Sequence, residues 1–118
     1  MPLARIVAVR TDLPNQIGER MTVDVGIDRE GYFSQKGITF GFFGEGGENP
    51  KIVWIFILRQ DGRISYSHDS ENHDDTNHGL NLVGKKIELN ELFTLTWDEG
   101  EEFTYRIERI VNLSEAYQ

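Results

Sequence analysis

The sequence predicts an all-β fold, namely a single-domain antiparallel β-sandwich or barrel of about seven or eight strands. Apolar and polar residues alternate with a period of two in several segments, most clearly in residues 21–28. Turn signals rich in Gly, Asn and Asp separate these segments, and no strand–helix–strand rhythm is present. The length of 118 residues suits one domain. We expect this domain to span residues 1–113, with a tail at 114–118.

The first two strands are expected at residues 3–9 and 21–28, joined by turn residues and paired antiparallel. In the second strand, the apolar side chains share one face and the polar ones the other. Gly31 follows this strand where a left-handed backbone is useful for a turn. The residues predicted to face the core are Met21, Val23, Val25 and Ile27.

A third strand is expected over residues 36–43, with Ile38, Phe40 and Phe42 on one face. Residues 51–59 are apolar on both faces, which predicts a strand at the centre of the fold. Four aromatic residues are expected to form the core: Phe40, Trp54, Phe56 and Phe103.

The dipeptide Asp61-Gly62 predicts a type I′ hairpin into a strand that carries Ile64 and Tyr66. Residues 84–97 then predict one long strand, bent near Asn90 and Glu91 where the alternation slips by one residue. Gly100 predicts a further hairpin turn.

The last strand is expected at residues 102–113. A helix over 101–113 is the alternative, but β-branched and aromatic residues favour the strand. The alternation predicts two faces, Phe103, Tyr105, Ile107 and Val111 on one side and Thr104, Arg106, Glu108 and Ile110 on the other.

Composition limits the classes of function. Twelve basic and twenty acidic residues give a formal charge of −8, which disfavours direct nucleic-acid binding and suits a basic protein partner. Cysteine is absent, which excludes disulfides and thiolate chemistry and fits a cytoplasmic location. The N-terminal ten residues are too short for a signal peptide, and the apolar run at 52–58 is too short to span a membrane. We therefore expect a soluble, cytoplasmic protein.

The most unusual segment is SHDSENHDDTNHG at residues 67–79, which contains all three histidines and four carboxylates but no apolar side chain. A polar loop of this length in a small domain is typical of a functional contact or of disorder. The residues that we expect to contact a partner here are Asp69, Glu71, Asp74 and Asp75.

A metal site made of His68, His73 and His78 is the alternative for this segment. Histidine side chains spaced five residues apart would not point to the same side of a strand or of a helix, so the loop would have to fold around the ion. The segment also lacks the glycine and the final glutamate of a calcium-binding loop. Contact with a partner is therefore the preferred interpretation.

A second acidic segment follows Trp97, which we expect to be half-buried where a strand meets its turn. If this segment and residues 67–79 lie at the same end of the fold, their electrostatic fields add and form one acidic rim. The contact residues predicted here are Trp97, Asp98, Glu99, Glu101 and Glu102.

No pattern typical of catalysis is present. Ser67 and His68 are adjacent, so a strand would point their side chains apart, and no nucleophile elbow occurs. The glycine-rich segment 41–47 lacks the Lys-Ser/Thr pair of a phosphate-binding loop. We therefore expect neither an enzyme nor a cofactor.

The predicted function is that of a non-enzymatic, acidic protein-binding module, such as an inhibitor or immunity-type protein that neutralises a basic partner. Two alternatives remain open. The first is a small-molecule or metal-binding barrel or sandwich that uses residues 67–79. The second is a structural or assembly subunit whose strand edges pair between copies, and the oligomeric state is left open.

Overall fold

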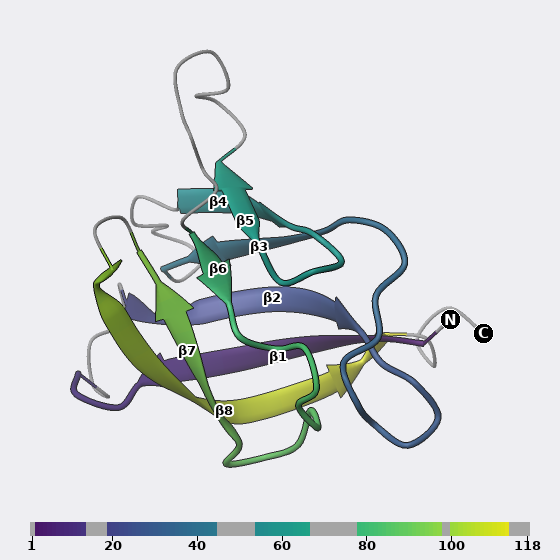
Figure 1. Cartoon of the computed structure of the whole chain (residues 1–118). Helices are drawn as coiled ribbons and strands as arrows, with labels where there is room; N and C mark the ends of the chain where they lie inside the picture. Colours follow the sequence, from purple (N-terminus) through teal and green to yellow (C-terminus); the bar gives the residue numbers. More distant parts are fainter. Residues whose placement is uncertain (1, 14–18, 45–53, 67–77, 98–99, 114–118) are drawn as a thin grey trace, which may run out of the picture.

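The alternating segments form one antiparallel sheet in the computed structural model, which describes residues 2–13, 19–44, 54–66, 78–97 and 100–113. The strands follow the order β5-β4-β3-β2-β1-β8-β7-β6, so that most strands pair with their neighbours in the chain and β8 returns to β1 (Figure 1). The predicted all-β fold is confirmed. Among the described residues, no helix could serve as a membrane span. The strands are β1 (Leu3–Arg10), β2 (Met21–Gly26), β3 (Thr39–Phe43), β4 (Trp54–Leu58), β5 (Ile64–Tyr66), β6 (Gly79–Leu80), β7 (Leu92–Thr96) and β8 (Glu102–Asn112).

The two edge strands, β5 and β6, approach each other and nearly close the sheet into a barrel. The amide of Ile64 donates to the carbonyl of His78 at 3.2 Å, and the amide of Leu80 donates to the carbonyl of Gly62 at 2.7 Å. Closure pairs backbone groups that a free sheet edge would leave to water or to another chain. The sequence left the choice between barrel and sandwich open, and the structure is a nearly closed barrel.

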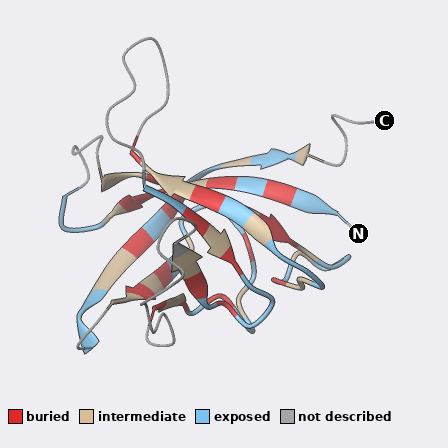
Figure 2. Cartoon of the chain, turned by 90° about the horizontal axis from the view of Figure 1, so that it is seen from above, coloured by how far each residue is buried: buried red, intermediate tan, exposed pale blue. Residues whose placement is uncertain are grey.

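The core lies inside this barrel, where buried residues alternate with exposed ones along the strands (Figure 2). The predicted first pair is confirmed, with Ala4 opposite Val25 and Ala8 opposite Met21. The predicted inner face of β2 is also confirmed, because Met21, Val23 and Val25 are all buried and Ile27 packs against them. The largest fully buried side chains are Tyr105, Phe56, Phe93, Ile6, Met21, Leu58, Ile64, Leu82 and Ile107.

A β-bulge reverses the faces of β8 near its end. The register with β1 shifts between Val7 and Ala8, which pair with Arg109 and Ile107 and leave Glu108 as the extra residue. Tyr105 and Ile107 are buried before the bulge, as predicted, and a helix here is excluded. After the bulge, however, Ile110 packs against the core and Val111 is exposed, so the predicted faces are wrong for these two residues.

Two of the aromatic residues predicted for the core are exposed, in different ways: Phe40 lies on the outer face of β3, whereas Trp54 shares the inner face of β4 with Phe56 but is the first residue of that strand. Phe40 and Trp54, both expected in the core, are 58% and 55% exposed. Phe56 is fully buried as predicted, and its ring covers Gly41, where a Cβ atom would overlap it. The space above Gly41 thus accepts the Phe56 ring, and strand alternation then directs Phe40 outward. Phe103 packs against the core from a partly buried position.

The prediction that residues 51–59 form the central strand is wrong. Within the described residues, β4 begins at Trp54 and lies next to the edge strand β5. Apolar side chains on both faces of this strand therefore do not reflect burial on both faces, because Ile55 is 51% exposed.

The hairpin between β4 and β5 is confirmed, but its predicted turn type is wrong. A type I′ turn needs a positive φ at both central residues, whereas here Gly62 has a φ of 91° and Asp61 does not have a positive φ. The amide of Gly62 donates to the carbonyl of Arg59 at 3.0 Å, and the amide of Arg63 donates to Asp61 Oδ1 at 3.0 Å. This arrangement is a type I turn followed by a left-handed glycine.

The long strand predicted for residues 84–97 is wrong over its first half, because β7 begins only at Leu92. Gly84 and Asn90 have φ values of 83° and 71°, which interrupt an extended chain. The amides of Lys85 and Glu91 close tight turns instead. The turns predicted at Gly31 and Gly100 are confirmed, with φ values of 93° and 83°.

Candidate functional site

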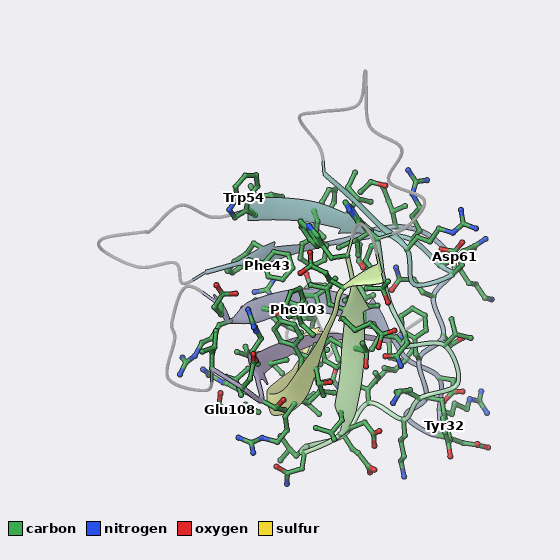
Figure 3. The ribbon with its side chains drawn as sticks, turned by 60° about the vertical axis from the view of Figure 1, so that its left-hand side comes forward. Tyr32, Phe43, Trp54, Asp61, Phe103 and Glu108 are labelled. Atoms are coloured by element: carbon green, nitrogen blue, oxygen red, sulfur yellow. The ribbon has the colours of Figure 1, made fainter. Side chains whose placement is uncertain are left out.

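One end of the barrel gathers four of the connections between strands. In an antiparallel meander every second connection returns to the same end. Here β1, β3, β5 and β7 finish at this end, and β2, β4, β6 and β8 begin there. Phe43 and Trp54 lie toward it in Figure 3, whereas Asp61 and Tyr32 lie toward the opposite end. Because of the charges that its connections carry, we call it the acidic end.

The charges of the chain divide unequally between the two ends. The four connections that start and finish at the acidic end are residues 11–20, 44–53, 67–78 and 97–101, and they contain 11 of the 20 carboxylates but two of the 12 lysines and arginines. The three connections at the opposite end contain five carboxylates and six basic residues. The negative charge of the protein therefore originates in segments anchored at one end.

The two polar segments singled out in the sequence are joined by a direct contact between their flanking residues. Gly79 of β6 lies opposite Thr96 of β7, which places His78 opposite Trp97. The two rings stack with centroids 4.5 Å apart and an interplanar angle of 16°. Cross-strand ring pairs of this kind stabilise a sheet. The residues that border both acidic segments thus lie side by side.

This contact corrects the prediction for the end of the 67–79 segment. His78 is 6% exposed and Gly79 begins β6, so these two residues belong to the barrel and not to a solvated loop. Within the described residues, no group of three or more histidine, cysteine, aspartate or glutamate side chains could hold a metal ion. His68 and His73 lie outside the described residues, and the metal alternative stays a prediction.

The predicted contact residues are only partly described. Trp97 is half-buried, as expected, and packs against the core. Glu101 and Glu102 are exposed where β8 begins. Whether these residues touch a partner stays a prediction. The remaining predicted residues lie outside the described part of the chain: Asp69, Glu71, Asp74, Asp75, Asp98 and Glu99.

A charged cluster around Arg10 at the acidic end was missed in the sequence. The guanidinium lies over the ring of Phe103, 4.4 Å from its centroid. It donates to Asp12 at 2.6 and 3.0 Å and to Glu19 at 3.3 Å. The hydrogen bond with Asp12 raises the pKa of Arg10 and lowers the pKa of Asp12. Arg10 thus partly neutralises two of the eleven carboxylates, Asp12 and Glu19, and the cluster keeps one excess negative charge.

The Arg10 cluster was missed because Arg10 and Phe103 are far apart in the sequence and meet only through the pairing of β1 with β8. The one local signal was the spacing of Arg10 and Asp12, opposite charges two residues apart at the end of a strand.

Comparisons of the chain with protein-family models, curated proteins and solved structures gave no match.

Proposed function

We propose that this barrel is a non-enzymatic protein-binding module whose acidic end contacts a basic partner, in the manner of an inhibitor or immunity-type protein. The observation that carries the proposal is the division of charge between the two ends of the barrel. Eleven carboxylates in four connections anchored at one end favour a local negative potential. Such a potential attracts and orients a protein that presents lysines and arginines. A cytoplasmic setting, which the lack of cysteine favours, is part of the same proposal.

An exposed aromatic residue supports this choice of surface. Trp54 begins β4 at the acidic end and is 55% exposed. Tryptophan is enriched among the residues that dominate the energy of protein interfaces. A basic partner at the acidic end would therefore meet an exposed apolar anchor at the same end of the barrel as the acidic connections. This combination distinguishes a specific contact from charge attraction alone.

Two matched double variants test the location of the contact. Glu101→Gln with Glu102→Gln removes two exposed carboxylates at the acidic end, and Glu30→Gln with Glu108→Gln removes two exposed carboxylates elsewhere. Binding of a synthetic arginine-rich peptide is measured by titration calorimetry. We expect the first pair to weaken binding by about fivefold and the second pair to have a much smaller effect.

The same variants are then used to capture partners from the native host at low salt and at about 0.5 M salt, which screens exposed charges. A partner specific for this end should be lost with Glu101→Gln/Glu102→Gln and with Trp54→Ser, but retained with the control pair. Equal losses for both charge pairs, or partners that persist at high salt with all variants, would contradict the proposal.

A further inference from the structure

A contiguous apolar surface lies on the outside of the barrel, on β3 and β4. Phe40 lies opposite Ile57 and Phe42 lies opposite Ile55, so that these four side chains form a square on the outer face. Phe40 and Ile55 are 58% and 51% exposed, and the other two are half-buried. Ile38, just before β3, extends the surface and is 56% exposed. We call Ile38, Phe40, Phe42, Ile55 and Ile57 the outer patch.

Charged side chains border the outer patch on its two sides. On the β5 side, Arg59 donates from Nε to Ser65 Oγ at 3.2 Å, and Ser65 lies opposite Ile57. On the β2 side, Asp24 lies on the same outer face and forms a bidentate ion pair with Arg5, at 2.8 and 3.2 Å. A guanidinium therefore borders one side of the outer patch, and a carboxylate that is already paired with Arg5 borders the other.

We propose that the outer patch is the interface of a homodimer, in which a two-fold axis runs along the strands between β3 and β4. Such an axis exchanges β3 with β4, so Phe40 meets Ile57 of the second copy and Phe42 meets Ile55 of the second copy. It also exchanges β2 with β5, which places Asp24 of one copy near Arg59 of the other.

A second copy of the chain is the partner that fits the outer patch, because a two-fold contact requires a surface whose apolar part and charged borders complement themselves. Its apolar square maps onto itself, and its Arg59 border maps onto the Asp24–Arg5 ion pair, whose carboxylate would then be shared between two guanidinium groups. Sheets that pack face to face need such interdigitating apolar faces. Exposed apolar surface of this kind is typical of an interaction site. The contact lies on the side of the barrel, so it is independent of the proposed role of the acidic end.

Sedimentation velocity tests the homodimer directly, with protein from about 5 to about 500 µM. We expect the wild type to shift from monomer to dimer over this range, and Phe40→Thr with Ile55→Thr to stay monomeric. Threonine retains a preference for strands, so the fold should persist, and circular dichroism checks it. Leu89→Thr with Val83→Thr is the control, because these residues are 58% and 64% exposed but lie outside the outer patch. This control should dimerise like the wild type.

The charged borders and the salt dependence give two further readouts. Arg59→Glu should weaken the dimer at least tenfold by placing like charges together, whereas Arg106→Glu, an exposed residue on β8, should not. Raising salt should strengthen the dimer, because each copy carries a formal charge of −8. Binding at the acidic end should instead weaken with salt. A wild type that stays monomeric at high salt, or a dimer that survives Phe40→Thr with Ile55→Thr, would overturn the inference.

Discussion

The carbonyl oxygen of Leu80 lies where a side chain on Gly62 would have to be, and the amide of Leu80 donates to the carbonyl of Gly62 at 2.7 Å. This contact joins the turn before β5 to β6, the two strands that are otherwise the free edges of the sheet. A residue other than glycine at position 62 would have to push these edges apart. The near closure of the barrel thus depends on a missing Cβ atom.

Gly62→Ala should therefore lower the free energy of unfolding by more than the cost of placing alanine in a left-handed backbone conformation. Gly84→Ala is the matched control, because Gly84 has a φ of 83° but a Cβ atom at this position would meet nothing within 4 Å. The control should lower the free energy of unfolding by about 1 kcal/mol, and Gly62→Ala by about 2–4 kcal/mol. Urea denaturation measures both. Equal losses of unfolding free energy in the two variants would show that the contact between Gly62 and Leu80 tolerates a side chain.

The stacked pair His78 and Trp97 should contribute to stability beyond the two side chains taken singly. Trp97→Ala should lower the free energy of unfolding by about 2–3 kcal/mol, and Trp54→Ala, at an exposed position, by less than about 1 kcal/mol. A double-mutant cycle with His78→Ala should give a coupling energy of about 0.5–1.5 kcal/mol. A coupling near zero would mean that the rings touch without stabilising each other.

Gly41 should accept no side chain because the Phe56 ring occupies the space above it. Gly41→Ala is expected to cost about 1–3 kcal/mol, since either the ring must leave its buried position or the strands must separate. Gly37→Ala is the control, because a Cβ atom at Gly37 meets nothing within 4 Å. Thermal unfolding of the two variants provides the comparison. If Gly41→Ala melts at the wild-type temperature, Phe56 has an alternative position that the barrel accommodates.

Tyr105 should make stability fall at alkaline pH. Burial raises the pKa of its phenol above the usual value, and the nearby charge of Glu19 adds to this effect. Below about pH 10 the phenol is neutral in both states, whereas above it only the unfolded chain ionises. The stabilisation from this group is therefore lost as pH rises above about 10.

Urea denaturation at several pH values from about 8 to about 11 tests this effect of Tyr105. Tyr105→Phe should lose less stability over this range than the wild type. Tyr32→Phe, a change at a residue that is 40% exposed, should follow the wild type. Identical profiles for Tyr105→Phe and the wild type would show that other groups cause the alkaline loss.

Local patterns predicted the strands better than they predicted which face is buried. The alternation correctly grouped Ile38, Phe40 and Phe42, but the period of a strand does not show which of its faces points inward. That choice depended on Phe56, which occupies the space above Gly41 from the neighbouring strand. In the same way, the bulge at Glu108 could not be predicted, because it is defined by the register with β1.

By itself, the sequence determined that the chain is all-β, that residues 3–9 and 21–28 pair, and that the protein carries excess negative charge. These properties follow from alternation, turn residues and composition, which are local or additive. Only the tertiary structure decided that the sheet closes at Gly62 and Leu80, that the outer patch faces solvent and that His78 stacks on Trp97. Each depends on pairing between strands distant in the chain. Their register and order are set by packing of the whole core, which no single segment encodes.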